Sequence, residues 1–252
     1  MVTQGQSRGR AVLVAVQGAG ELLVTLGVLL ALFAAYSLWW TDVIADHRAD
    51  QAGDRLRKAW SATATATAPV PLPPAGPATP EAPSPAPPAF AAGDGVGFLH
   101  VPAMGRDYQV LIRMGTDEGT LADGVAGVYT EPYAAAMPWD GEGNFALAAH
   151  RDGHGAKFHD LDQVGPGDAV VVETRDTWYV YRVDATLPET SQYDTGVIAP
   201  VPTGSPYRGP GRYITLTTCT PVYTSLYRMA VWGSLVREEP VDAGRTPPAE
   251  LR

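Results

Sequence analysis

Residues 213–236 read YITLTTCTPVYTSLYRMAVWGSLV, and this stretch decides the fold. Two runs rich in β-branched and aromatic residues, 213–219 and 227–236, are typical of β-strands, and the segment 221–226 between them is typical of a turn. The two strands are therefore predicted to form a hairpin. Cys219 ends the first strand and Arg228 opens the second, so we expect these two residues to face each other at one end of the hairpin.

A histidine ends another predicted strand, because residues 144–151 read NFALAAHR. A cysteine nucleophile needs a base or an imidazolium partner and a donor for the developing oxyanion. Cys219, His150 and Arg228 supply these parts and are the candidate catalytic residues. Each also has a plainer interpretation: a buried cysteine that acts as a small apolar side chain, a polar residue at a strand end, and a surface ion-pair partner.

The rest of the chain after residue 95 is also rich in strand patterns. Candidate strands cover residues 97–102, 109–114, 144–149, 169–173, 177–187, 213–219 and 227–236, and turn signals such as GPGD at 165–168 separate them. Residues 116–128 are expected to contain a short helix. Short strands at this spacing, with little helix, predict a mainly β fold, either a small barrel or a sandwich.

The N-terminal part is apolar. Residues 22–40 read LLVTLGVLLALFAAYSLWW and carry no charge, which is long enough for a helix that spans a bilayer. Trp39 and Trp40 close the run as interfacial aromatic residues do. The run is longer than a signal-peptide core and no small-x-small cleavage site follows it, so an uncleaved signal anchor is expected. Arg8 and Arg10 before it favour an inside N-terminus.

These patterns divide the chain into six parts. We expect a cytoplasmic segment at 1–21, the anchor at 22–40, a juxtamembrane amphipathic helix at 41–60, an Ala/Pro/Thr-rich linker at 61–92, a catalytic domain at 93–239 and a tail at 240–252. Half of the positions 69–88 are proline, a composition that favours an extended spacer over a packed core.

The charge and the cysteine content of the chain limit the classes of function that it can have. The chain has 18 basic and 27 acidic side chains and a net charge of −9, with no basic stripe, so nucleic acid is not an expected partner. Cys219 is the single cysteine, which excludes an internal disulfide. A lone thiol in an exported domain needs another reason, and a reactive nucleophile supplies one.

A metal site is the other chemistry considered. His150, His154 and His159 could ligate together, but Gly153 and Gly155 break any helix that would align them. No Asp, Glu or Cys framework with zinc spacing accompanies them. We therefore expect neither a metal nor a cofactor, and we expect His154 and His159 to be loop residues.

The strings FALAAHRDGHGAKFHDLDQVGPGD at 145–168 and YITLTTCTPVYTSLYRMAVWGSL at 213–235 resemble sortases, most closely the class E sortases of actinobacteria. The anchor string GELLVTLGVLLALFAAYSLWWTDV at 20–43 is similar as well. Two positions depart from the family pattern. Ala149 precedes His150 where glycine is usual, and Thr220 follows the cysteine where class E often has histidine.

This resemblance implies an eight-stranded sortase-type β-barrel with short helices, preceded by one transmembrane helix. Cys219 would attack the Thr–Gly bond of a C-terminal sorting signal, LAxTG- or LPxTG-like, and form a thioacyl enzyme. His150 would serve as acid and base, Arg228 would stabilise the oxyanion, and Thr218 would position substrate. The implied partners are secreted proteins that carry the signal and a cell-wall amine acceptor similar to lipid II. The implied location is the outer face of a Gram-positive cell membrane.

Three alternatives are weaker. L,D-transpeptidases carry a Ser-His-Gly-Cys-x-Arg string that is absent here. Papain-like peptidases place the cysteine first, at a helix N-terminus, whereas here the histidine comes first. The non-enzyme alternative is a tethered β-domain that binds a cell-wall ligand or partner protein, and reactivity of the Cys219 thiol with an alkylating agent would separate it from an enzyme.

Overall fold

The computed structural model describes residues 4–66 and 90–252 and divides the chain into two compact units, Met1–Thr41 and Asp42–Arg252. Helix α1 (Gln4–Ala66) contributes to both units. The proline-rich part of the predicted linker, 69–88, lies outside the described residues.

The first unit is the apolar part of α1. Leu22, Leu29 and Phe33, three of its large side chains, are each more than half exposed. By length and composition, α1 contains a segment that could cross a membrane.

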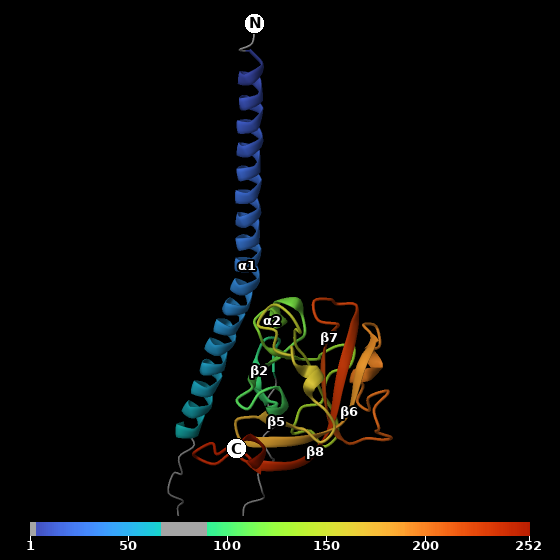
Figure 1. Cartoon of the computed structure of the whole chain (residues 1–252). Coiled ribbons are helices and arrows are strands. Elements are labelled where there is room, and N and C mark those ends of the chain that lie inside the picture. The colour runs from blue at the N-terminus through green and yellow to red at the C-terminus, as the bar shows by residue number, and fades with distance from the viewer. Residues whose placement is uncertain (1–3, 67–89) are drawn as a thin grey trace, which may run out of the picture. The chain divides into compact units, whose positions relative to one another are not determined.

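The second unit is a closed barrel of eight strands in the order β1-β2-β3-β4-β7-β8-β6-β5 (Figure 1). The strands are β1 (Gly95–His100), β2 (Gln109–Met114), β3 (Ala126–Val128), β4 (Gly143–Ala148), β5 (Ala169–Glu173), β6 (Thr177–Ser191), β7 (Arg212–Thr220) and β8 (Tyr227–Pro240). In the part of this unit that the structure describes, five short helices complete the fold: η1 (Pro102–Met104), α2 (Glu118–Leu121), η2 (Leu161–Gln163), η3 (Thr195–Ile198) and η4 (Ala249–Leu251). The predicted eight-stranded barrel is confirmed.

The sequence patterns located seven of the eight strands and missed β3. This strand has three residues, Ala126, Gly127 and Val128, which is too short to show an alternation of apolar and polar side chains. A side chain at Gly127 would collide with the Gly115 carbonyl, so close backbone packing requires glycine there. The short helix expected in 116–128 is α2, which Asp117 caps by accepting a hydrogen bond from the Thr120 backbone N–H.

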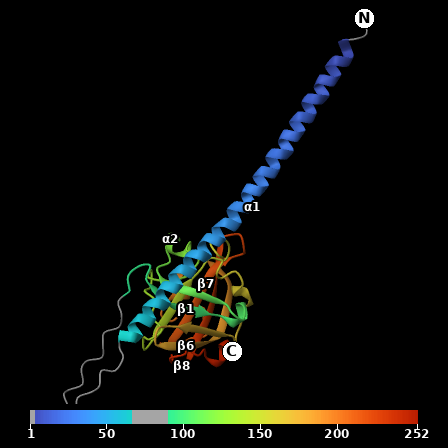
Figure 2. The same cartoon turned by 90° about the vertical axis from the view of Figure 1, so that its left-hand side faces the viewer.

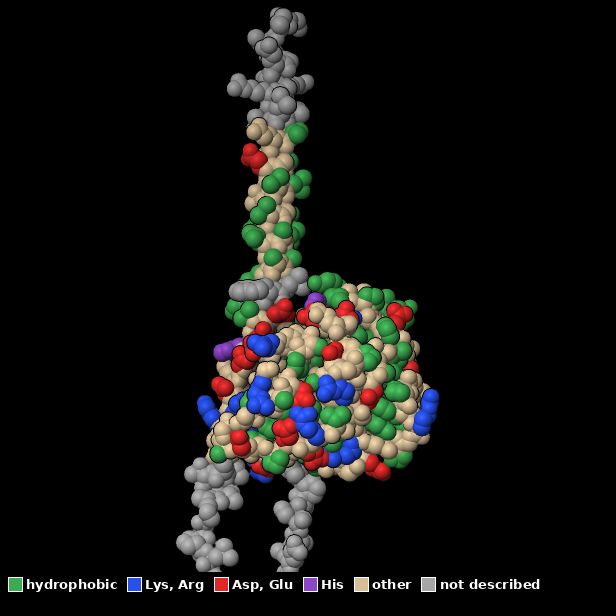
Figure 3. All heavy atoms as spheres, turned by 60° about the horizontal axis from the view of Figure 1, so that its bottom comes forward, with side chains coloured by type: hydrophobic (Ala, Val, Ile, Leu, Met, Phe, Trp, Pro, Cys, Tyr) green, Lys and Arg blue, Asp and Glu red, His purple; other side chains and the backbone are tan. Residues whose placement is uncertain are grey.

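Alternate side chains of the strands fill the barrel. The core includes Leu99, Ile112, Phe145, Leu147 and Leu216, all almost completely buried. Charges of both signs are interspersed on the face shown in Figure 3, which fits the absence of a basic stripe from the sequence.

The predicted helix after the apolar run is confirmed, and it packs on the barrel. The C-terminal part of α1 lies beside β1 and β2 (Figures 1 and 2). Ala49, Leu56 and Trp60 of the helix contact the buried side chains of Phe98 and Leu111. This helix therefore shares a core with the strands instead of standing apart as a spacer.

A buried carboxylate joins three segments at this surface. Glu173 at the end of β5 accepts hydrogen bonds from Arg57 of α1, His100 of β1 and Arg245 of the C-terminal tail. Burial alone would raise the pKa of Glu173, but the hydrogen bonds from these three partners outweigh it and lower the pKa to about 2. The tail also packs Leu251 beside the cluster of Trp178 and its neighbours, so residues 240–252 lie on the barrel.

Candidate active site

Strand pairing brings the predicted site residues together. β4 and β7 are parallel neighbours, with Ala148 opposite Thr217. Beyond the last pair, the Ala149 backbone N–H donates to the Thr217 carbonyl at 3.3 Å and the Thr218 hydroxyl donates to the Ala149 carbonyl at 2.7 Å. Since both strands run in the same direction, His150 and Cys219 follow in step at the same end of the barrel.

Cys219 and Arg228 are direct cross-strand partners in the β7–β8 hairpin, as the sequence pattern predicted. Residues directly opposite in an antiparallel pair present their side chains on one face. The Cys219 thiol is free and half-buried, which does not match the interpretation of a fully buried cysteine. Arg228 donates from Nη1 to the Ser225 and Tyr227 carbonyls, and it forms no ion pair with a carboxylate in the part of the chain that the structure describes.

His150 sits in a partly desolvated position. Its ring lies 5.1 Å from the ring of His154, centroid to centroid, and its Nε2 is buried with no hydrogen-bond partner among the described residues. Burial lowers the pKa of His150, the charge of His154 lowers it further, and the carboxylates of Asp152 and Glu118 oppose the change. At neutral pH this imidazole is therefore mostly neutral and can accept a proton.

The three histidines of the 150–159 loop do not converge. His154 lies beside His150, but His159 turns away and its Nδ1 is 2.9 Å from the Arg151 carbonyl oxygen. Among the described residues no three His, Cys, Asp or Glu side chains come close enough to hold a metal ion.

Two residues that the sequence did not single out support the site. Arg151 is buried, pairs with Asp162 at 3.0 Å and donates to the Thr220 hydroxyl at 3.0 Å, so it fastens the loop after β4 to the end of β7. Tyr129, directly after β3, has its hydroxyl 2.9 Å from the Thr217 hydroxyl. Tyr129 was missed because β3 was missed, and burial raises the pKa of its phenol.

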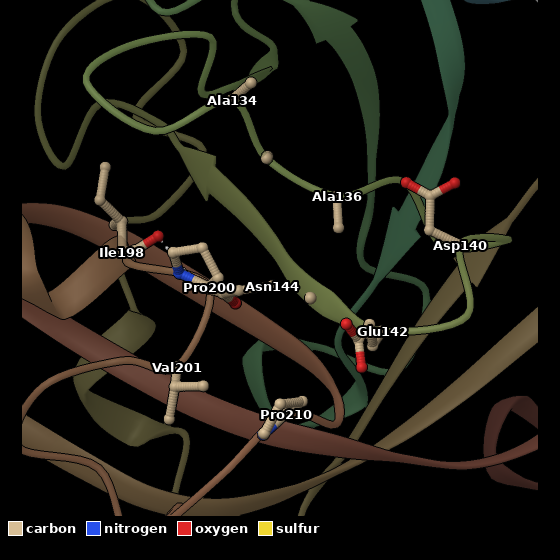
Figure 4. Close-up of a pocket in the computed structure, with 11 residues that line it drawn as sticks. Ala134, Ala136, Asp140, Glu142, Asn144, Ile198, Pro200, Val201 and Pro210 are labelled. Atoms are coloured by element: carbon tan, nitrogen blue, oxygen red, sulfur yellow. Dashed lines mark hydrogen bonds between the residues drawn. The ribbon is translucent and has the colours of Figure 1, made fainter.

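A pocket of about 370 Å³ lies at the opposite end of β4. Figure 4 shows it between the β3–β4 loop at Ala134 and Asp140, the start of β4 at Asn144, and the segment after η3 at Pro200. Asn144 forms part of its wall and donates to the Ile198 and Ala199 carbonyls. Because His150 follows the other end of β4, this pocket is separate from the Cys219 region.

The model of the sortase domain family matches residues 99–236 of the chain. Sortase SrtE2 of Streptomyces coelicolor is 48% identical over 254 residues, covering 99% of this chain and 94% of the relative. The chain belongs to the sortase family. Sortase SrtE1 of the same organism is 40% identical over 245 residues, which cover 95% of this chain and 63% of that relative.

Solved sortases share the fold. The crystal structure of sortase E1 from Streptomyces coelicolor with a tripeptide in its active site is 44% identical, with a TM-score of 0.60 over 65% of this chain and all of that one. Sortase E from Streptomyces avermitilis is 35% identical, with a TM-score of 0.58 and the same coverage. These relatives are class E sortases, as the sequence motifs indicated.

Sortases are cysteine transpeptidases, so this chain is an enzyme of that type. The alternative of a tethered domain that only binds a ligand is therefore set aside. His150 and Cys219 are 69 positions apart in the sequence, and the pairing of β4 with β7 brings them to the same end of the barrel. Cys219 and Arg228 are nine positions apart, and the β7–β8 hairpin places them opposite each other.

Proposed function

We propose that this sortase is a membrane-anchored transpeptidase that joins secreted proteins to a cell-wall amine. Its substrate is a protein with an LAxTG- or LPxTG-like C-terminal sorting signal, cleaved between Thr and Gly. Cys219 is the nucleophile, His150 the acid and base, and Arg228 the oxyanion donor. Thr218 positions the substrate from the end of β7, where its hydroxyl donates to the Ala149 carbonyl next to His150.

The single observation that carries these roles is the count of cysteines. A cysteine transpeptidase needs a thiol, and Cys219 is the one thiol in all 252 residues. Its half-buried position beside the strand-end histidine and opposite an arginine without a carboxylate partner in the described ranges supports the same assignment.

In the first half-reaction, neutral His150 accepts the proton of the Cys219 thiol, and the thiolate attacks the threonine carbonyl. The carbonyl oxygen becomes an oxyanion beside the Arg228 guanidinium. When the C–N bond breaks, the imidazolium of His150 gives its proton to the departing glycine amine, which leaves a thioacyl enzyme.

The second half-reaction reverses these proton transfers. The acceptor amine attacks the thioacyl carbonyl, and His150 takes a proton from the attacking nitrogen. The C–S bond breaks, and the proton returns to the Cys219 sulfur. The group with a lowered pKa is therefore used once as a base and once as an acid in each half of the cycle.

The anchor and the location complete the proposal. The apolar run 22–40 stays in the membrane, with residues 1–21 inside and residues 41–252 outside. The exposed apolar side chains of α1 before Thr41, such as Leu22 and Phe33, support a lipid environment for this segment.

The test is cleavage of LAxTG and LPxTG peptides by the full chain in detergent, followed by mass spectrometry of the protein. We expect a thioacyl adduct on Cys219 and none in Cys219→Ala. His150→Ala should lose about 10²–10⁴-fold in rate, whereas the matched control His159→Ala should stay near wild type because its ring faces the Arg151 carbonyl. Peptide cleavage by Cys219→Ala would end the assignment.

A further inference from the structure

Large apolar side chains are exposed at the mouth of the candidate active site. In the described part of the second unit, seven large apolar side chains are exposed, and four of them lie at this one corner. Tyr223 is 83% exposed and Leu226 64%, both in the β7–β8 loop, and Tyr227 follows at 42%. Tyr193 is 82% exposed, two residues after Ser191, which pairs with Tyr227. We name these four residues the loop patch.

The loop patch has the composition of a membrane-interface element. Residues 220–227 read TPVYTSLY and carry no charge, although the chain as a whole is strongly acidic. Tyrosines have an apolar ring and a polar tip, a combination that favours the boundary between headgroups and acyl chains. A soluble surface rarely gathers such side chains unless they contact a partner or a membrane.

Hydrogen bonds connect this corner to the point where the chain leaves the apolar run. The Tyr223 backbone N–H donates to the Asp152 carboxylate, and the Gly155 backbone N–H donates to the Asp42 carboxylate at 2.9 Å. Lys157 also pairs with Asp46 at 2.7 Å. Three residues of chain from Asp152 to Gly155 span at most about 11 Å, so the loop patch and Asp42 belong to the same end of the barrel.

Asp42 comes two residues after Trp40, which closes the apolar run. Covalent connection alone therefore keeps the end of the run within about 8 Å of Asp42. If residues 22–40 span the bilayer, the barrel end that carries the loop patch is held close to the lipid surface. Figure 1 shows the β7–β8 connection at the same end of the barrel as α2.

We propose that the loop patch docks on the lipid headgroup region and turns the mouth of the active site toward the membrane. This inference rests on the anchor of the proposed function. Three carboxylates near the patch accept hydrogen bonds: Asp152 and Asp42 from backbone N–H groups, and Asp194 from the Thr190 hydroxyl. The contact is apolar and aromatic, so it does not require anionic lipid or low salt. It presents Cys219 to an acceptor amine carried on a lipid.

The first test is spectroscopic and needs no activity. Full-length Cys219→Ala carrying Leu226→Cys is labelled with a polarity-sensitive dye and reconstituted in phosphatidylcholine vesicles, with and without phosphatidylglycerol. The matched control is Val236→Cys on β8, an apolar residue that is 50% exposed and ten positions further along the chain than Leu226. We expect quenching by spin-labelled lipid at position 226 and none at 236, in both vesicle types. Equal quenching at the two positions would overturn the proposal.

The second test separates lipid docking from peptide binding. In Tyr223→Ser/Leu226→Ser, we expect transfer to an amine-bearing lipid in vesicles to fall by about tenfold, as an orientation effect. Cleavage of a soluble peptide in detergent should stay near wild type, as in the control Val236→Ser. An equal loss in both assays would show that the loop patch binds the peptide and would refute docking on lipid. Failure of the wild type to cleave any peptide would count against the proposed function and leave the quenching result standing.

Discussion

Removing the part of α1 that covers the barrel should destabilise the catalytic domain strongly. We compare two soluble forms, residues 42–252 and residues 90–252. In the shorter form Phe98 and Leu111, which are 5% and 4% exposed in the full chain, lose the cover of Leu56 and Trp60. Fully burying one large apolar side chain contributes about 1.5–3 kcal/mol, so two such side chains account for about 3–6 kcal/mol.

The lost helix also removes Arg57, which donates to Glu173 at 2.9 Å and lies 4.0 Å from the centre of the Phe98 ring. A typical domain is stable by about 5–15 kcal/mol, so the shorter form should lose a large share of its stability. Urea unfolding followed by circular dichroism measures the difference.

A matched pair of point variants isolates the packing in the 42–252 form. Leu56→Asp places a carboxylate against Phe98 and should lower the urea midpoint clearly. Lys58→Asp places one on the exposed side of the same helix and should change the midpoint little. The same midpoint for the two truncated forms, or for Leu56→Asp and the unmutated 42–252 form, would refute the packing argument.

Three further predictions concern charges. Arg228→Lys keeps the charge but loses the planar fork, so kcat/KM for peptide cleavage should fall by about 10²–10³-fold; a rate near wild type would remove Arg228 from the site. His154→Gln removes the neighbouring ring whose electrostatic effect lowers the pKa of His150, so the acid limb of the kcat/KM profile should move to higher pH while the rate above that limb stays near wild type. An unmoved limb would contradict this coupling between the two histidines. Glu173→Gln removes a carboxylate whose pKa is lowered to about 2. The contribution of this carboxylate to the free energy of unfolding is fully present above the pKa that it has in the unfolded chain, and it is lost as the pH falls through 2. The variant should therefore be less stable by about 3 kcal/mol at pH 7 and should lose less stability than wild type between pH 5 and pH 2, as thermal melts across that range would show.

Local patterns in the sequence were sufficient to predict the positions of most strands of the barrel. The strands with apolar alternation and clear turns, such as β2 and β5, were predicted with the bounds that the structure has. β6 was predicted to end at residue 187 but continues to Ser191, and β8 was predicted to end at residue 236 but continues to Pro240. The two strands form a long antiparallel pair with three register shifts. A periodicity argument does not follow a strand past such irregularities, because each one reverses the faces.

The parts of the site that escaped prediction depend on contacts distant in sequence. The hairpin placed Cys219 opposite Arg228 because a six-residue turn joins its strands. The contact of His154 with His150 depends on a loop in which His154 has a positive φ of 51°. No sequence pattern predicts this backbone conformation for a histidine. Arg151 holds the loop after β4 against the end of β7 only because β4 pairs with β7 and because Asp162, eleven residues later in the chain, forms an ion pair with it.

The parallel pairing of β4 with β7 has a consequence for how the chain tolerates change in length. The distance between His150 and Cys219 is set by the six aligned pairs from Gly143–Arg212 to Ala148–Thr217, and not by the chain that connects the two strands. Insertions next to exposed residues of the connection 199–211, such as Arg208, should therefore leave the two residues at the same separation. A single deletion inside β4 or β7 would shift one partner by a whole residue and turn its side chain to the opposite face of the sheet. Variation in length is thus confined to the connections, while both strands must keep their residue count.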